Sequence, residues 1–259
     1  MAAGQAGTSF LAGGTFLLAG DRREKPPTVI DVGRILPKAI ERSGGALSIG
    51  AGATFQDLVD SAAVPAILRD AALSMVNRNV RNRATVGGNI GAGKSCASLM
   101  PVFLALGAKL RVATPSSGSA RPETRTIAEW SGRPEGIILS VDLELGTGMK
   151  GAFARWTRTA CDVSVLTACV AYRAEGGPAG GGVLRDLSIA MGGLGPHARR
   201  FPELVAPFEG RPLPSTADIE SIAGPLFQPR SDWRGSAAFK RLRAASLLAD
   251  ALHHAEVIA

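Results

Sequence analysis

Two glycine pairs are the residues of this sequence best suited to hold a ligand. The first lies in residues 12–15 (AGGT), and the second lies in residues 85–89 (TVGGN). Glycines let the backbone approach phosphate oxygens and present N–H donors to them, and neighbouring Thr or Asn side chains add hydrogen bonds. The two pairs predict contacts to a phosphate-bearing ligand, and the alternative is that both are tight turns without a binding function.

A motif typical of nucleotide triphosphate sites overlaps the second pair. Residues 88–95 (GNIGAGKS) match GxxxxGK[ST], the pattern of a loop that cradles the phosphates of ATP or GTP. Such a loop follows a buried parallel strand, whereas residues 78–83 are polar and cationic and do not fit the centre of a sheet. We therefore rank a P-loop site third among the hypotheses, and we expect Lys94 in a loop near a phosphate.

Side chains that catalyse reactions by themselves are scarce. The titratable candidates are three imidazoles and three thiols: His197, His253, His254, Cys96, Cys161 and Cys169. No GxSxG, HExxH or paired-carboxylate pattern accompanies them. The cysteines lack CxxC spacing and are too few for an iron–sulfur cluster or an all-cysteine zinc site. We expect no catalytic side chain and no metal site, so a bound cofactor would carry the chemistry.

The composition favours a folded protein that meets anions. The chain has 259 residues, of which 46% are hydrophobic and 32 are glycine, and its net charge is +7. A positive chain suits an anionic ligand, an acidic partner or nucleic acid, but the aromatic residues are not interleaved with a basic stripe. We therefore expect no nucleic-acid binding.

The sequence also indicates a compartment. It contains no apolar run of about 18 residues that could cross a bilayer. Residues 1–20 lack the basic start of a secretory leader, and an odd number of cysteines suits a reducing environment. We expect a cytoplasmic protein without a membrane span.

Strands and helices alternate along the part of the chain that must position the glycine pairs. We expect strands at residues 9–12, 28–32, 46–53, 109–112 and 136–143. We expect helices at residues 55–59, 66–76 and 99–106. Thr54 is placed to cap the first of these helices.

The tail of the chain predicts one longer amphipathic helix over residues 237–257. Three leucines are expected to face a core: Leu242, Leu248 and Leu252. Three basic residues are expected largely on the other faces: Lys240, Arg241 and Arg243.

Ordered segments of the whole chain resemble one family. They are residues 12–18 (AGGTFLL), 49–58 (IGAGATFQDL), 81–90 (RNRATVGGNI), 101–110 (PVFLALGAKL), 134–143 (PEGIILSVDL), 153–166 (FARWTRTACDVSVL), 187–200 (LSIAMGGLGPHARR) and 232–244 (DWRGSAAFKRLRA). In this order they are similar to the FAD-binding (medium) subunit of molybdenum hydroxylases, the xanthine dehydrogenase and carbon monoxide dehydrogenase group.

The resemblance implies an α+β fold in three parts. Residues 1–45 and 46–148 would form two α/β FAD-binding subdomains of the vanillyl-alcohol-oxidase-like (PCMH) kind, the first of them short at its N-terminal end. Residues 149–259 would form an α+β domain of the CO dehydrogenase flavoprotein type. The resemblance implies FAD contacts at Leu11, Ala12, Gly13, Gly14, Thr15, Phe16, Met75, Ala84, Thr85, Gly87, Gly88, Asn89, Ser98 and Ile138.

The function implied is electron transfer within an oxidoreductase complex. Such a subunit passes electrons from the 2Fe-2S clusters of a small partner, which a large molybdopterin partner reduces, through FAD to an acceptor such as NAD+. A structural or assembly subunit with weakened or lost FAD binding is the alternative.

Departures from the family pattern motivate that alternative. Ser98 stands where the family often has an Asp that binds the FAD ribose, and Lys94 and Ser95 replace a usual Ser-Pro. A family lysine near the flavin corresponds to Ala154, with Arg155 beside it. The first strand and helix that precede the glycine loop in the family are not matched in this sequence.

Overall fold

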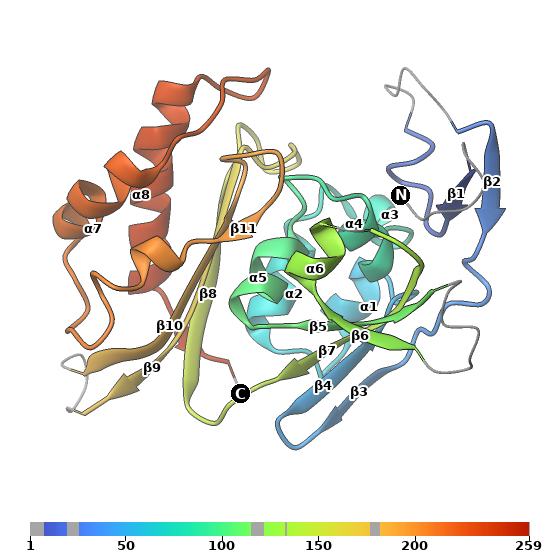
Figure 1. Ribbon diagram of the computed structural model, residues 1–259, viewed down its shortest axis with the longest axis horizontal. Helices are drawn as coiled ribbons and strands as arrows, with labels where there is room; N and C mark the ends of the chain where they lie inside the picture. Colours follow the sequence, from blue (N-terminus) through green and yellow to red (C-terminus); the bar gives the residue numbers. More distant parts are fainter. Residues whose placement is uncertain (1–7, 20–25, 115–121, 133, 177–181, 259) are drawn as a thin grey trace.

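The protein consists of two halves that lie side by side, each built on a five-stranded sheet (Figure 1). This is a computed structural model, which describes residues 8–19, 26–114, 122–132, 134–176 and 182–258. Within these residues no helix is both long and apolar enough to cross a membrane. The mixture of antiparallel sheets and helices confirms the expected α+β class.

A small parallel sheet lies at the edge of the N-terminal half. Its two strands are β1 (Thr8–Leu11) and β2 (Thr28–Asp31), which confirm the expected strands to within one residue. β2 is exposed along its whole length. Val32 and Leu36, which follow β2, are buried in the core of the N-terminal half and attach the pair to it.

The middle of the chain forms an antiparallel sheet with helices packed against it (Figure 1). The strand order is β3 (Ile40–Ser43), β4 (Ala46–Gly50), β7 (Ile137–Glu144), β5 (Lys109–Ala113) and β6 (Glu123–Thr126). The helices are α1 (Phe55–Asp60), α2 (Ala66–Leu73), α3 (Arg78–Arg81), α4 (Val86–Gly91), α5 (Leu99–Ala105) and α6 (Ile127–Gly132). Leu110 and Val112 of β5 point to one side and are fully buried, as the period of two in a half-buried strand requires.

Capping explains where α1 begins. The Thr54 hydroxyl accepts a hydrogen bond from the Asp57 N–H at 3.1 Å, and the Asp57 carboxylate accepts one from the Thr54 N–H at 2.8 Å. This reciprocal pair is a capping box, which satisfies two N–H groups that the first helical turn leaves open. The cap predicted at Thr54 is confirmed.

Two short helices were missed by the pattern of apolar residues. Residues 77–91 predict a polar approach and a loop, yet this stretch contains α3 and α4. Asn77 accepts a hydrogen bond from the Val80 N–H at 3.0 Å, and Thr85 accepts one from the Gly88 N–H at 3.1 Å. Side-chain caps therefore start both helices without an amphipathic pattern.

The C-terminal half is a second antiparallel sheet with two helices. The strand order is β11 (Arg199–Arg200), β10 (Val183–Gly192), β9 (Leu166–Glu175), β8 (Met149–Trp156) and β12 (Glu256–Val257). The helices are α7 (Thr216–Ala223) and α8 (Ala237–His253), with 3₁₀ turns at η2 (Pro202–Leu204) and η3 (Gly224–Leu226).

Strand β9 is buried on both faces and joins the two halves. Cys169 and Ala171 belong to the core of the N-terminal half, whereas Val170 and Tyr172 belong to the core under α8. The sheet thus lies between α5 on one side and α8 on the other (Figure 1). Two apolar cores, one on each face of β9, therefore hold the halves together.

Helix α8 ends at His253 and not at residue 257, where strand β12 lies instead, and it corrects two further predictions about the tail. Leu248 and Leu252 are fully buried as expected, but Leu242 is 68% exposed and the side chain of Lys240 is 1% exposed. The helical period alone assigned these two residues to the wrong faces. Lys240 is buried because the Asp232 carboxylate and the Arg230 carbonyl receive its ammonium.

The buried Lys240 belongs to a network that reaches the other half. Its Nζ lies 2.8 Å from the Asp232 carboxylate, which also pairs with Arg234 at 2.8 Å. Burial alone would raise the pKa of Asp232, but hydrogen bonds from Lys240 and Arg234 outweigh it and lower the pKa to about 2. Arg234 donates in turn to the Ser95 hydroxyl at 3.5 Å, across the joint between the halves.

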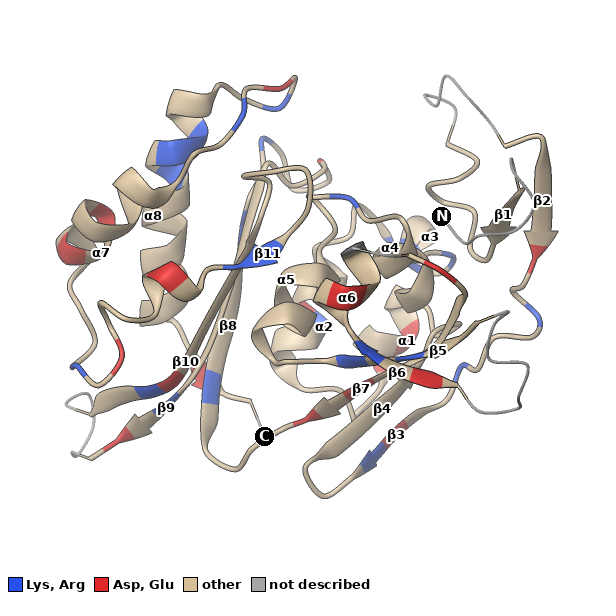
Figure 2. Cartoon of the chain, viewed as in Figure 1, with Lys and Arg blue, Asp and Glu red and all other residues tan. Residues whose placement is uncertain are grey.

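Charged residues of both signs are interspersed over the two halves (Figure 2). The predicted boundaries at residues 45 and 148 stay predictions, and strands β3 and β4 pair across the first of them. Residues 115–121 and 177–181 lie outside the described part.

Candidate cofactor-binding cavity

A cavity of about 690 Å³ lies where the small sheet, the helices of the N-terminal half and the C-terminal half meet. The expected contact residues all line it: Leu11, Ala12, Gly13, Gly14, Thr15, Phe16, Met75, Ala84, Thr85, Gly87, Gly88, Asn89, Ser98 and Ile138. Segments that are far apart in the sequence are thus brought around one space. That they bind a cofactor stays a prediction.

The loop after β1 presents open hydrogen-bond donors. Within the described part of the chain, the N–H groups of Gly13, Gly14 and Thr15 donate to no acceptor. Gly14 has φ +76°, a conformation that favours glycine and turns the chain sharply after the strand. Because unpaired N–H groups beside a cavity are suited to anionic oxygens, this loop is ready to receive a phosphate.

The same loop rests on the segment before the second glycine pair. A Cβ atom at Gly13 would overlap the carbonyl oxygen of Arg83. The Arg83 Nε donates to the Gly13 carbonyl at 3.2 Å. Gly13 is therefore needed for contact between two chain segments, while its neighbours keep their donors.

The second glycine pair has a different structure. It lies in the first turn of α4, where the Gly87 N–H donates to the Ala51 carbonyl at 2.8 Å and the Gly88 N–H donates to Thr85. The Asn89 N–H donates to the Thr85 carbonyl at 2.9 Å. These donors are used inside the protein, so the expected role of the pair as a phosphate-facing loop does not follow from its backbone.

One atom near this pair lacks a partner. The Oδ1 atom of Asn89 is buried and accepts no hydrogen bond from the described residues. A buried amide oxygen without a donor costs free energy, about 1–3 kcal/mol. Asn89 lines the cavity, so this oxygen is available to a donor of a ligand.

The P-loop hypothesis does not fit the geometry. A P-loop connects a buried strand to the helix that follows it. Here residues 88–95 start inside α4 and run past its end, and the short helix α3, not a strand, precedes α4. The match to GxxxxGK[ST] therefore does not indicate a nucleotide triphosphate site.

Several lining residues were not predicted from the sequence. They are contributed by α6 and by the C-terminal half: Trp130, Ser131, Asp162, Val163, Ser164 and His197. Lys94, which the sequence predicts in a loop near a phosphate, also lines the cavity. Hydrogen bonds from the Arg158 side chain and the Val163 N–H, both at 2.8 Å, hold the pKa of Asp162 below its usual range. Asp162 is thus a stably ionised carboxylate and unsuited to act as a base near neutral pH.

Arg155 supports the wall of the cavity from behind. Its guanidinium donates to the Ser74 carbonyl at 2.7 Å and to the Ala160 carbonyl at 2.8 Å. Ser74 lines the cavity, whereas neither Ala154 nor Arg155 does. Arg155, two residues after Phe153, therefore connects two wall segments, whereas Ala154, which corresponds to the family lysine, contributes no contact to the cavity.

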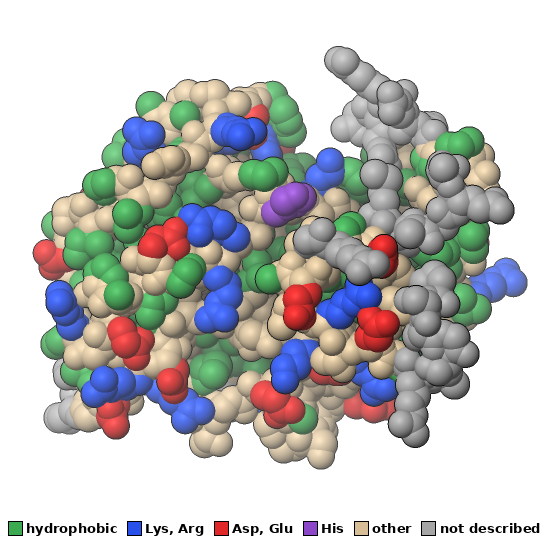
Figure 3. Space-filling view, viewed as in Figure 1, with side chains coloured by type: hydrophobic (Ala, Val, Ile, Leu, Met, Phe, Trp, Pro, Cys, Tyr) green, Lys and Arg blue, Asp and Glu red, His purple; other side chains and the backbone are tan. Residues whose placement is uncertain are grey.

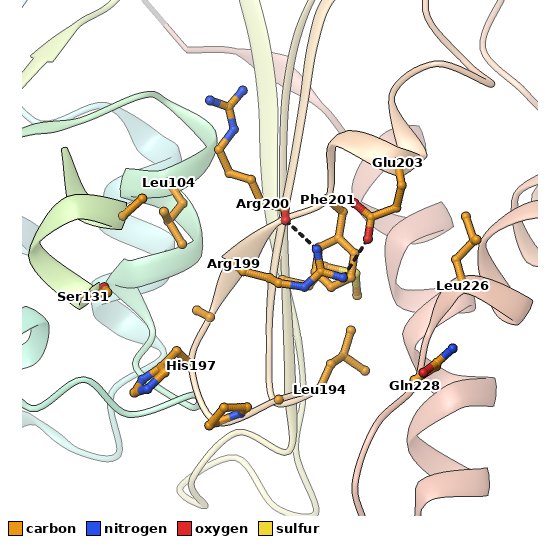
Figure 4. A pocket seen from close by; sticks show the side chains of 15 residues that line it. Leu104, Ser131, Leu194, His197, Arg199, Arg200, Phe201, Glu203, Leu226 and Gln228 are labelled. Carbon is orange, nitrogen blue, oxygen red and sulfur yellow. Dashed lines mark hydrogen bonds and ion pairs between the residues drawn. The ribbon is translucent and has the colours of Figure 1, made fainter. Parts of the chain in front are cut away.

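A second cavity of about 820 Å³ adjoins the first (Figure 4). The two share Ser131 and His197 as lining residues. Arg199 pairs with Glu203 at 2.6 Å and lies 3.7 Å from the centre of the Phe201 ring. Figure 3 shows the hollow between the halves, with hydrophobic, basic and histidine side chains around it.

The arrangement supports binding and not side-chain catalysis. Among the described residues no three His, Cys, Asp or Glu side chains gather as metal ligands. Burial raises the pKa of the Cys169 thiol, which makes it unreactive. The first cavity instead offers open N–H donors, a lysine and apolar walls, a combination suited to a large anionic cofactor.

Comparisons with known proteins show the family and the fold of the chain. Residues 1–139 match the family described as the FAD binding domain in molybdopterin dehydrogenase, and residues 151–255 match the CO dehydrogenase flavoprotein C-terminal domain. The chain is 30% identical to the uncharacterized protein YgfM of Escherichia coli (strain K12) over 241 residues, which are 93% of this chain and 85% of that protein.

More distant proteins resemble most of the chain in sequence or in structure. The glyceraldehyde dehydrogenase medium chain of Sulfolobus acidocaldarius is 23% identical over 252 residues, covering 92% of this chain and 87% of that one. The structure of carbon monoxide dehydrogenase from Hydrogenophaga pseudoflava, lacking the Mo-pyranopterin moiety of its cofactor, superimposes with a TM-score of 0.83 at 23% identity. That superposition covers 96% of this chain and 89% of the other and shows a common fold.

Proposed function

Because the chain belongs to the family of FAD-binding domains in molybdopterin dehydrogenases, we propose that it is the electron-transfer subunit of a molybdenum hydroxylase complex. FAD would bind in the cavity of about 690 Å³. The observation that carries the proposal is the convergence of both glycine pairs, Met75, Ser98 and Ile138 on that one space.

The residues present fit FAD in size and chemistry. Cofactor sites typically enclose about 300–1,000 Å³, which includes this cavity. The unpaired N–H groups of residues 13–15 suit phosphate oxygens, and the buried Asn89 Oδ1 needs a donor such as a hydroxyl or ring N–H. Met75 and Ile138 supply apolar surface for a flat ring.

The protein itself would bind the cofactor, orient it and keep water away. Phe55 and Trp130 are buried at 0% and 4% exposure beside the cavity and exclude solvent from its inner side. Arg155 fixes two wall segments through its hydrogen bonds to carbonyl groups. Bound FAD supplies the chemistry of taking up electrons singly and releasing them in pairs, which no side chain of the cavity offers.

This role requires two partner subunits. The chain has three cysteines, too few for an iron–sulfur cluster, so a small 2Fe-2S subunit would deliver the electrons. A large molybdopterin subunit would oxidise the substrate, and an acceptor such as NAD+ would remove the electrons. The medium chain of glyceraldehyde dehydrogenase named above supports a subunit of this kind. We place the complex in the cytoplasm, where exposed Cys161 stays reduced.

The test is an absorbance spectrum of the purified chain after incubation with FAD and removal of unbound flavin. The expected result is a flavin spectrum in the near-UV and blue that stays with the protein. A protein fraction without flavin bands would refute FAD binding.

An assembly subunit without FAD is the second candidate. It is favoured by Ser98, which is 5% exposed and replaces an acidic residue of the family pattern, and by the internal use of the N–H groups of residues 87–89. Purification of the tagged chain from its own cells distinguishes the two. Recovery of iron–sulfur and molybdenum-containing partners without flavin would support this candidate, and recovery with flavin would support electron transfer.

A further inference from the structure

The cavity holds one permanent positive charge among its described lining residues. Lys94 is the only Lys or Arg there, and the one carboxylate, Asp162, is already paired with Arg158. A diphosphate brings two negative charges into a space that is otherwise lined by glycine, apolar and hydroxyl groups. Such charges need a cationic partner because partial desolvation penalises them.

The ammonium of Lys94 makes a weak cation–π contact with the ring of Phe16. Its Nζ lies 4.6 Å from the centre of the Phe16 ring. Among the described residues it forms no hydrogen bond or ion pair. A cation over an aromatic ring at an exposed site is held less strongly than one in a charge-assisted hydrogen bond to a phosphate. The ammonium can therefore exchange the ring for an anion without breaking an ion pair.

The C-terminal half fixes the backbone around this lysine. The Nδ1 atom of His197 lies 2.8 Å from the Gly93 carbonyl oxygen, and Arg234 donates to the Ser95 hydroxyl at 3.5 Å. Gly93 has φ +58°, so the chain turns sharply just before Lys94. The residues on both sides of the lysine are thus anchored, and the side chain has a defined starting point next to the loop after β1.

We propose that Lys94 selects flavins that carry a diphosphate, by moving its ammonium from the Phe16 ring to the phosphate oxygens. This inference rests on the proposed binding of FAD. It assigns to Lys94 the charge and to residues 13–15 the N–H donors, so that two different segments contact the same anionic group. It also gives the lysine of the false P-loop motif a role in phosphate binding.

The experiment compares three variants with the wild-type protein. Lys94→Met removes the charge and keeps a long side chain, Lys94→Arg keeps the charge, and Lys109→Met removes a charge from an exposed lysine of β5 that lines neither cavity. Dissociation constants for FAD and for riboflavin, which has the ring but no phosphate, are measured by flavin fluorescence at low and at high salt.

We expect Lys94→Met to weaken FAD binding by about 10-fold to 100-fold at low salt and to leave riboflavin binding unchanged. Its FAD affinity should also depend less on salt, because screening acts on the charge that was removed. Lys94→Arg should retain most of the FAD affinity, and Lys109→Met should behave like the wild type.

Three results would overturn the inference. They are wild-type FAD affinity in Lys94→Met, an equal loss of FAD and riboflavin, and a loss of FAD affinity with unchanged salt dependence. A wild-type chain that binds no FAD at any salt concentration would instead refute the proposed function, and the inference with it.

Discussion

The two glycine pairs line one cavity, yet they do different things. After β1, the N–H groups of residues 13–15 are unpaired and Gly14 adopts a left-handed conformation. In α4, the N–H groups of residues 87–89 are all used inside the protein. The first pair thus offers hydrogen-bond donors to a ligand. The second pair belongs to the internally hydrogen-bonded structure of residues 85–91, which we call the frame.

The difference comes from what precedes each pair. The first follows the end of a strand, where the chain turns and its amides lose their partners. The second follows Thr85, whose hydroxyl caps the helix and takes up a donor. In both pairs one glycine is required by another segment of the chain: Gly13 by the Arg83 carbonyl and Gly87 by Ala51. A glycine pair is therefore not by itself a sign of phosphate binding.

The sharpest test of the donor loop is Gly13→Ala. The added Cβ would overlap the Arg83 carbonyl, so the loop must move away and carry the N–H groups of residues 13–15 with it. We expect FAD affinity to fall by about 100-fold, the upper end of what an overpacked contact costs. Flavin fluorescence titration measures it, with Gly224→Ala as the control because nothing lies within 4 Å of a Cβ at that position and Gly224 lines neither cavity. Unchanged FAD affinity in Gly13→Ala would show that the loop does not position the ligand.

The frame is tested by Gly87→Ala. A Cβ there would lie 2.8 Å from the Ala51 Cβ and 3.1 Å from its carbonyl oxygen. We expect the free energy of unfolding to fall by about 1–3 kcal/mol, and FAD affinity measured on the folded protein to change by less than about tenfold. Urea unfolding gives the first value. Gly91→Ala in the same helix should be neutral or stabilising by up to about 1 kcal/mol. The comparison between the pairs fails if Gly87→Ala affects FAD binding more than Gly13→Ala does.

A substitution at Asn89, the residue after the second pair, tests whether this side chain contacts the ligand or only stabilises the frame. Asn89→Ala removes a buried oxygen that has no donor, so the ligand-free protein should be equally stable or more stable, by up to about 1 kcal/mol. FAD affinity should fall by about threefold to tenfold, the value of one hydrogen bond. Thermal unfolding with and without FAD measures both effects. A less stable ligand-free variant with normal FAD affinity would mean that Asn89 serves only the frame.

Much of the fold could be predicted because its signals are local, and the contact residues that the family resemblance implies all line the cavity. The cap at Thr54, the strand of residues 109–112 and the helix of residues 99–106 are each encoded by neighbours in the sequence, and the structure confirms them. The family was identifiable from the order of eight segments, and the match over residues 1–139 confirms it.

What could not be predicted depends on contacts between distant residues. Lys240 is buried because the Asp232 carboxylate, which lies outside α8, receives its ammonium, and no periodicity within the helix reveals that. Asp162 and His197 reach the cavity only because the C-terminal sheet packs against α5. The role of an N–H group likewise depends on whether a distant carbonyl, such as that of Ala51, accepts it.

The smallest effect on stability and on FAD affinity is expected for Thr85→Ala, which weakens the frame without introducing a steric clash. Thr85→Ala removes the cap of α4 and frees the Gly88 N–H, which should lower the free energy of unfolding by about 1 kcal/mol. Thr54→Ala, which uncaps α1 outside the cavity, should cost a similar amount and serves as the matched control. A freed donor at the end of a fraying helix is not held in place, so FAD affinity in Thr85→Ala should stay within about threefold of the wild type. Urea unfolding and FAD titration of both variants check this. A clear gain in FAD affinity for Thr85→Ala alone would show that an open N–H is all that distinguishes the first pair from the second.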